Sequence, residues 1–210
     1  MTPTIEEIKA EIINLTPEDF LLKYIYCEDN WYFRNILRIS SEDIVAFGNK
    51  FKAIVGDNFE LTTDHIKMVG SGKTGFSLAP REGKLYQEFC DDESIRKISD
   101  IDVAIISRNL FNKYWDLLRK SFRAKFKYRY PQIQTAIYRG YISEKDLVAI
   151  DGCRKDWKDM ANNSKNELYS TLYIRHEITY RIYRRLEDFH DYHISSIKKI
   201  KKGNIYATTI

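Results

Sequence analysis

One short stretch constrains the fold of this 210-residue chain more than any other: SDIDVAIIS, residues 99–107. Residues 103–106 form an uninterrupted aliphatic run, and two aspartates, Asp100 and Asp102, come just before it. A short, strongly apolar run of this kind is typical of a strand buried in the middle of a sheet. The chain is therefore expected to build further strands and covering helices around this segment.

The two aspartates add a chemical requirement to this strand. Because side chains alternate along a strand, Asp100 and Asp102 project from the same face, roughly 7 Å apart, while Ile101 and Val103 point into the core. Like charges on a buried strand are costly unless a cation compensates them. Mg²⁺ is typically held by one or two carboxylates together with substrate phosphate oxygens. The spacing therefore predicts that Asp100 and Asp102 bind Mg²⁺ or Mn²⁺.

A plainer interpretation of the aspartates also fits the residues. Ser99-Asp100 is turn-like, so Asp100 would then be an ordinary cap. Asp102 would remain as one buried acid in a structural ion pair.

A second strand is expected at DHIKMVGSG, where Ile66 and Met68 alternate with less apolar positions until glycine breaks the strand. The following GKT, residues 72–74, suggests a phosphate-binding P-loop. A Walker A loop, however, needs its first glycine at position 67, which is Lys67. The chain is not expected to form a strict P-loop.

A strand ending in Gly70-Ser71, followed by a strand bearing Asp-x-Asp, resembles the nucleotidyltransferase fold, the DNA polymerase β-like superfamily. The resemblance covers VGS (69–71) and SDIDVAII (99–106). It implies that Gly70 and Ser71 bind the triphosphate of an NTP substrate and that Asp100 and Asp102 bind the metal. Lys73 is a further candidate for phosphate contact, although a lysine in a polar loop is usually only solvated.

The sequence departs from the family pattern in two ways. Residues 72–99 separate Ser71 from Asp100, which is longer than is usual, so an insertion must form a loop or hairpin. The family also needs a third acid on a later strand, which acts as base for the incoming hydroxyl. Glu177 is the best candidate, and Asp146 and Asp151 are weaker ones.

The function implied by the resemblance is a metal-dependent nucleotidyltransferase, with Asp100, Asp102 and Glu177 as catalytic residues. It would move an NMP from an NTP to a hydroxyl of RNA (such as a tRNA end), of a protein or of another nucleotide. Toxin–antitoxin and antiviral-defence nucleotidyltransferases are similar to this sequence in these general features. Two alternatives stay open: a nucleotide-binding or regulatory partner subunit without turnover, and a helical interaction protein without a nucleotide site.

The pattern along the chain predicts an α+β fold with a nucleotidyltransferase-like core, a small mixed sheet, N-terminal helices and a helical C-terminal part. Residues 1–60 form the helical segment, 61–130 the core, and 131–210 a C-terminal part packed on the core as one domain. Further expectations concern single features. In the first part of the chain they are helices starting at Thr4, Thr16 and near Ser40, a stop at Gly56 and an amphipathic helix from Asn109. In the later part they are a turn at Gly140, a helix fraying at Asn162-Asn163, a strand or alternatively a helix within residues 172–185, and a last helix ending in KKIKKGN.

Charge and composition limit the partners only broadly. The net charge of +4 permits a nucleic-acid partner without requiring one. The basic, aromatic stretch RKSFRAKFKYRYP (119–131) suits RNA contact, but a helix with a solvated basic face explains it equally, and KKIKKGN has the same two interpretations. Three unpaired cysteines and the absence of a leader or a long apolar segment lead us to expect a cytoplasmic protein with no membrane partner.

Overall fold

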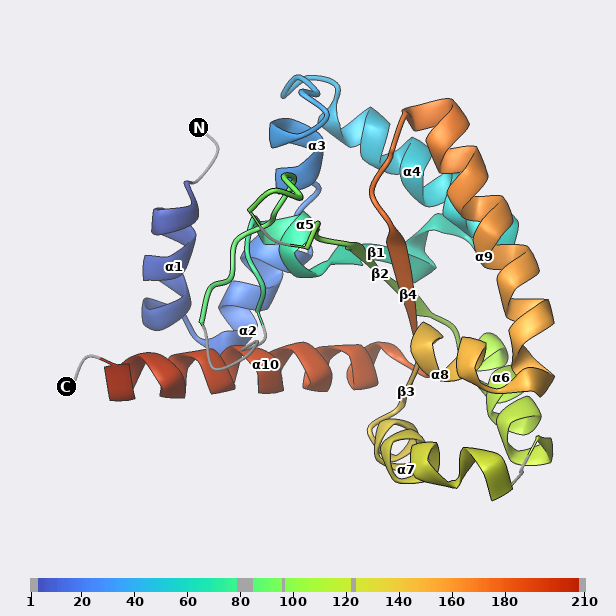
Figure 1. Ribbon diagram of the computed structural model, residues 1–210. Coiled ribbons are helices and arrows are strands. Elements are labelled where there is room, and N and C mark those ends of the chain that lie inside the picture. Colours follow the sequence, from blue (N-terminus) through green and yellow to red (C-terminus); the bar gives the residue numbers. More distant parts are fainter. Residues whose placement is uncertain (1–3, 79–84, 96, 122–123, 208–210) are drawn as a thin grey trace. The chain divides into compact units, whose positions relative to one another are not determined.

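The computed structural model describes residues 4–78, 85–95, 97–121 and 124–207 and shows an α+β protein (Figure 1). In this part of the chain ten α-helices accompany a four-stranded mixed sheet. The helices are α1 (Ile5–Asn14), α2 (Pro17–Phe20), α3 (Trp31–Asn35), α4 (Ile44–Phe59), α5 (Gly70–Thr74), α6 (Arg108–Lys120), α7 (Tyr130–Tyr138), α8 (Glu144–Ala149), α9 (Asp151–Leu172) and α10 (Leu186–Ala207). Leu21–Ile25 form a π-helix, and Thr63–His65 and Ala124–Arg129 form 3₁₀ helices.

The sheet has the strand order β1-β2-β4-β3. Its strands are β1 (Ile66–Val69), β2 (Ile101–Ile106), β3 (Tyr141–Ser143) and β4 (Ile178–Tyr183). The apolar run after the aspartates is an interior strand, β2, as predicted, and every residue of β2 except Asp102 is buried. The predicted strands at β1 and β4 are also confirmed. The short edge strand β3 was not anticipated; it pairs antiparallel with β4.

The N-terminal helices form where capping residues place them. Thr4 caps α1 in a capping box with Glu7, and Thr16 caps α2 by accepting a hydrogen bond from the Asp19 N–H. Ile8 and Ile12 form the buried face of α1. The three cysteines are free thiols, as their spacing predicted.

The stop predicted at Gly56 is wrong, because α4 continues to Phe59. Gly56 serves a different purpose. A Cβ atom at this position would lie 2.5 Å from the Leu61 carbonyl oxygen, so only glycine allows the chain after the helix to fold back this closely. The Leu61 N–H donates to the Gly56 carbonyl at 2.8 Å and fixes the return.

The predicted fraying at Asn162-Asn163 is also wrong, because α9 is continuous from Asp151 to Leu172. Both asparagines are exposed, while Ala161, Ser164 and Leu168 on the opposite side are buried. Burial of this stripe outweighs the low helix propensity of asparagine. The last helix, α10, likewise runs past KKIKKGN to Ala207.

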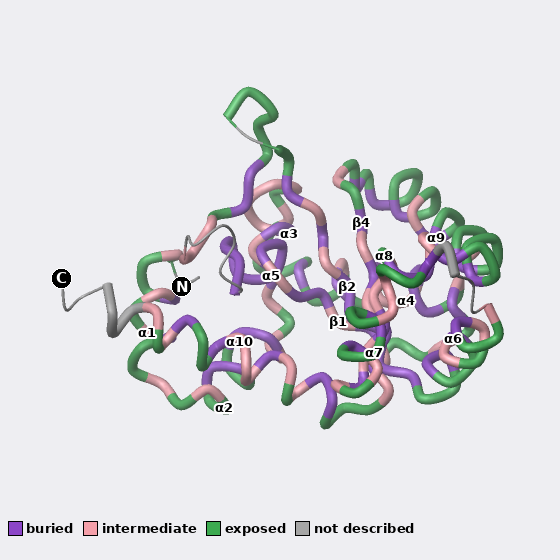
Figure 2. Tube along the Cα trace, turned by 60° about the horizontal axis from the view of Figure 1, so that its bottom comes forward, coloured by how far each residue is buried: buried purple, intermediate pink, exposed green. Residues whose placement is uncertain are grey.

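The chain divides into two compact units, each made of separated stretches. One comprises Met1–Gly48, Met68–Asp102 and His190–Ile210, and the other comprises Asn49–Lys67 and Val103–Phe189. Figure 2 shows buried positions recurring along the helices and strands. In the second unit Trp157 is fully buried, with ring centroids 5.3 Å from both Phe59 and Tyr114. None of the helices in the described residues combines the length and apolar character needed to cross a bilayer.

The expected turn at Gly140 is confirmed and belongs to the second unit. Gly140 has a φ of +75°, which glycine adopts without strain. A Cβ atom here would lie 2.2 Å from Cγ of Asp188. The Asp188 carboxylate accepts hydrogen bonds from the guanidinium of Arg184 at 3.0 and 3.1 Å. The turn before β3 is thus closed against the start of α10.

Candidate active site

The Gly-Ser turn connects β1 directly to the short helix α5. Val69 is extended, and Gly70 then adopts a φ of +67° as it opens the helix. Gly75 ends the helix with a φ of +85°, and its N–H donates to the Ser71 carbonyl at 2.9 Å. The GKT residues are therefore the body of a single helical turn, and their side chains are not arranged around an open loop. Ser71 itself is only 4% exposed.

Gly70 lies against Asp102. A Cβ atom on Gly70 would be 2.3 Å from Oδ2 of Asp102 and 3.1 Å from its Cγ. Any larger residue at position 70 would occupy the space of this carboxylate. The fold thus brings the Gly-Ser turn and one of the paired aspartates together, although residues 72–99 separate Ser71 from Asp100 in the sequence.

Asp102 is the second residue of β2, whereas Asp100 immediately precedes the strand and is not part of it. Ile101 and Val103 are 0% and 1% exposed, as their predicted inward direction requires, whereas Asp100 and Asp102 are half-buried. Ser99, just before the aspartates, is hydrogen-bonded twice to Cys90. The Ser99 hydroxyl accepts the Cys90 N–H, and the Ser99 N–H donates to the Cys90 carbonyl, both at 2.9 Å. This pair of bonds closes the insertion immediately before the aspartates.

The described ends of the insertion pair as an expected hairpin would. Phe76 and Glu88 form an antiparallel bridge, and the Ser77 N–H donates to the Gln87 carbonyl at 2.8 Å. Residues 79–84 lie outside the described part of the chain. The long spacing between the turn and the aspartates is therefore taken up by a locally paired excursion.

Lys73 is placed where it supports the backbone. Its side chain is buried at 5% exposure, and its ammonium group donates to the carbonyl oxygen of Cys27 at 2.6 Å and also to that of Asp29. Burial lowers the pKa of this ammonium. Phosphate contact by Lys73 stays an untested expectation, and the observed geometry assigns its donors to two carbonyl groups.

Glu177, the candidate third acid, precedes β4 in the other compact unit. Its carboxylate forms an ion pair with Lys165 at 2.7 Å, and its side chain is 70% exposed. The weaker candidates also have local partners. The buried Asp146 accepts from the Ser143 hydroxyl at 2.8 Å, and Asp151 pairs with Arg154 at 3.2 Å.

The donor chemistry of the Gly-Ser turn and the aspartates fits a divalent cation. Carboxylate oxygens are the ligands that Mg²⁺ prefers, and the glycine at position 70 lets the backbone of the turn approach the Asp102 carboxylate without a clash. Within the described residues, no group of three or more acidic, histidine or cysteine side chains is assembled around one point. A metal bound here would thus have, among these described residues, at most these two carboxylates as protein ligands of this kind, and phosphate or water would supply the rest.

Some basic residues of the segment 119–131 and of KKIKKGN have local partners. Residues 119–131 form no single helix: α6 ends at Lys120 and a 3₁₀ segment precedes α7, with residues 122–123 outside the description. Arg119 pairs with Asp116 at 3.0 Å, while Tyr128 is 72% exposed. In the C-terminal segment, Lys201 donates to the Leu15 carbonyl at 2.6 Å.

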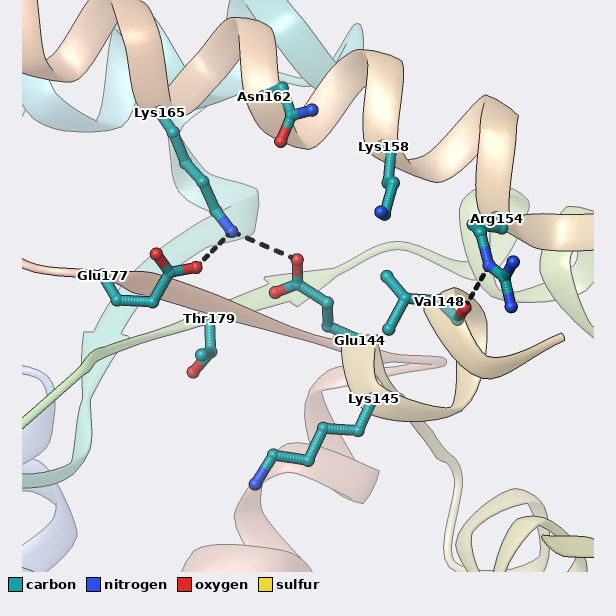
Figure 3. A pocket seen from close by; sticks show the side chains of 9 residues that line it. All are labelled: Glu144, Lys145, Val148, Arg154, Lys158, Asn162, Lys165, Glu177 and Thr179. Carbon is teal, nitrogen blue, oxygen red and sulfur yellow. Dashed lines mark hydrogen bonds and ion pairs between the residues drawn. The ribbon is translucent and has the colours of Figure 1, made fainter. Parts of the chain in front are cut away.

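A concave site in the second compact unit was not anticipated from the sequence. It is a cavity of about 590 Å³ that lies between α8, α9 and the start of β4 (Figure 3). Its signal was present in the sequence as polar residues at positions 154, 158, 162 and 165, which share one helical face. The expectation that this helix frays concealed the pattern.

Comparison of the chain with protein families, with curated proteins and with solved structures finds no match in any of the three.

Proposed function

We propose that this protein is a metal-dependent nucleotidyltransferase with a nucleotidyltransferase-like core, moving an NMP from an NTP to a hydroxyl acceptor. The observation that supports it best is the approach of Gly70 to Asp102, with 2.3 Å between a Cβ built on the glycine and the carboxylate oxygen. Such an arrangement puts a turn suited to phosphate beside a carboxylate suited to metal. It is the spatial relationship on which the resemblance depends.

Each residue of the turn and the strand has a role in this proposal. The backbone of Gly70 and the backbone and hydroxyl of Ser71 hold the triphosphate. Asp100 and Asp102 hold Mg²⁺, which when bound neutralises charge on the reacting phosphate oxygens. Lys73 keeps α5 in place by binding the carbonyl groups of Cys27 and Asp29, so that the turn is preorganised before substrate arrives.

Glu177 is the proposed base that accepts the proton of the attacking hydroxyl. Its carboxylate forms an ion pair with Lys165 at 2.7 Å, and carboxylates commonly serve as general bases. The same ion pair also supports a second candidate function. If the ion pair with Lys165 prevents Glu177 from acting as a base, the protein binds NTP and metal without turnover. It then acts as a nucleotide-binding partner subunit.

The acceptor we favour is RNA. The exposed Tyr128 in the segment 119–131 offers an aromatic surface for base stacking, and the neighbouring basic residues suit phosphate contacts.

A transfer assay separates the two functions. The protein is incubated with each α-³²P-labelled NTP, Mg²⁺ and total cellular RNA, and the RNA, protein and small-molecule products are resolved. We expect label in the RNA fraction and a loss of at least about a hundredfold in Asp102→Asn, because the metal loses a ligand. Asp191→Asn, an exposed aspartate of α10, is the matched control and keeps full activity.

Transfer that persists undiminished in folded Asp102→Asn contradicts the enzyme. Absence of label in every fraction, from wild-type protein that binds NTP, supports the partner subunit instead.

A further inference from the structure

The cavity between α8, α9 and the start of β4 has the size of a small-molecule site. Its volume of about 590 Å³ falls within the range of roughly 300 to 1,000 Å³ common for ligand pockets. All its lining residues belong to the same compact unit. They are Glu144, Lys145 and Val148 from α8, Arg154, Lys158, Asn162 and Lys165 from α9, and Glu177 and Thr179 from the last strand and its approach.

One wall of the cavity is a row of hydrogen-bond donors along α9. Arg154, Lys158, Asn162 and Lys165 are spaced by four, four and three residues, which places them on one side of the helix. Figure 3 shows the Lys158 side chain pointing from α9 into the space beside α8. Lys145 of α8 contributes a further ammonium group to the lining.

The acids of the cavity are already bound by other groups. One Glu144 oxygen accepts the backbone N–H of Tyr180 at 2.8 Å, and the other pairs with Lys165 at 3.3 Å. Lys165 also holds Glu177, so a single ammonium group neutralises both carboxylates in part. These acids therefore offer little to a further cation.

The remaining cations are differently placed. Arg154 donates to the Val148 carbonyl at 2.6 Å, which fixes its guanidinium at the end of α8. Within the described residues, neither Lys145 nor Lys158 has a carboxylate partner, and Figure 3 draws none for them. The lining thus has two more cationic than acidic side chains, and two of its lysines lack a counter-charge.

We propose that this cavity binds a phosphate-bearing ligand, with Lys145 and Lys158 as the contacting cations and Asn162 as a neutral donor. Ammonium and amide donors suit the several oxygens of a phosphate group. The ligand is either a free polyphosphate or nucleotide, or one phosphate of a nucleic-acid strand. The cavity includes neither the Gly-Ser turn nor the paired aspartates, although Glu177, the proposed base, lines it, and binding there does not require turnover.

Fluorescence anisotropy with a labelled single-stranded oligouridylate tests the site, with ATP and inorganic tripolyphosphate as competitors. Lys158→Glu is compared with Lys155→Glu, which changes the same charge on the same helix outside the cavity. Lys155 is 90% exposed and pairs with Asp159 at 2.9 Å. Lys145→Glu, on α8, provides a second, independent variant.

We expect Lys158→Glu and Lys145→Glu each to weaken binding about tenfold at low salt and to reduce the salt dependence by about one phosphate contact. Lys155→Glu changes binding less than about twofold. Displacement of the oligonucleotide by tripolyphosphate identifies a free phosphate ligand, whereas resistance to it identifies a nucleic-acid strand. Absence of binding to every probe, or equal losses in Lys158→Glu and Lys155→Glu, overturns the proposal. Binding of these probes does not depend on transfer of an NMP, so this measurement and the transfer assay can fail separately.

Discussion

Gly70 and Asp102 share a space that has no room for a Cβ atom. Gly70 combines a φ of +67° with a clash distance of 2.3 Å to the Asp102 carboxylate, so both its backbone and its surroundings demand glycine. Of the candidate residues, this pair gives the most direct physical link between the turn after β1 and the strand β2.

Gly70→Ala should therefore damage the site and the fold together. The left-handed backbone alone costs an alanine about 1 to 3 kcal/mol of unfolding free energy, and the new methyl group displaces the Asp102 carboxylate. Gly72→Ala, in the same helix as Gly70, is the matched control. The nearest atom to its new Cβ would be Sδ of Met68 at 3.6 Å, which is an ordinary van der Waals contact. Urea unfolding and calorimetric binding of Mg²⁺-NTP measure both effects. Equal stability and equal binding in the two variants would show that the close approach has no consequence.

Lys73 should act on stability more than on chemistry. In Lys73→Met, the carbonyl groups of Cys27 and Asp29 lose their shared donor inside the protein, which costs about 1 to 3 kcal/mol. Lys199→Met, at an exposed position of α10, should change the free energy of unfolding by less than about 0.5 kcal/mol. Urea unfolding of the two variants checks this prediction. A Lys73→Met protein with wild-type stability and weakened NTP binding would instead place the ammonium group at the phosphates.

Asp188 should make stability depend on acid pH. Burial acts to raise the pKa of this carboxyl, but the hydrogen bonds and charges of Arg184 and Arg185 outweigh it, so the pKa lies below its ordinary 3.8. A lowered pKa stabilises the folded state above the unfolded value, and this stabilisation is lost as the pH falls through the folded value.

Asp188→Asn should accordingly be less stable than wild type near pH 6, by about 1 to 3 kcal/mol, with the difference shrinking below pH 3.8. Urea unfolding across this range measures it, with the exposed Asp191→Asn of the same helix as control. A difference between wild type and Asp188→Asn that stays constant with pH would exclude the carboxylate as its source.

The elements that could be predicted are those whose signals are local. The capping threonines located α1 and α2, and the apolar run after Asp102 located the interior strand, because each signal lies within a few residues of its effect. Gly56 was misread because the atom that requires a glycine there is the Leu61 carbonyl beyond the helix end. The strand β3 has three residues, which is too short for an alternating pattern.

In the candidate site, too, local sequence signals could be interpreted, whereas contacts between distant residues could not be predicted. Gly70, Ser71 and the aspartates could be named because their residue types and their order along the chain carry a resemblance. The burial of Lys73 could not be foreseen, since its carbonyl partners at Cys27 and Asp29 are more than forty residues away along the chain. The cavity beside α9 could not be predicted because Asn162 and Asn163 suggested that the helix frays there. Burial of Ala161 and Leu168 on the other side of α9 keeps the helix continuous.

The central claim is that the Gly-Ser turn and the paired aspartates form one site for metal and NTP. Isothermal titration of the protein with a non-hydrolysable ATP analogue, with Mg²⁺ or with EDTA, tests it most directly. We predict binding that requires Mg²⁺, is at least about tenfold weaker in Asp102→Asn and is unchanged in Asp191→Asn. Binding of equal strength in folded Asp102→Asn, or in EDTA, would contradict the claim.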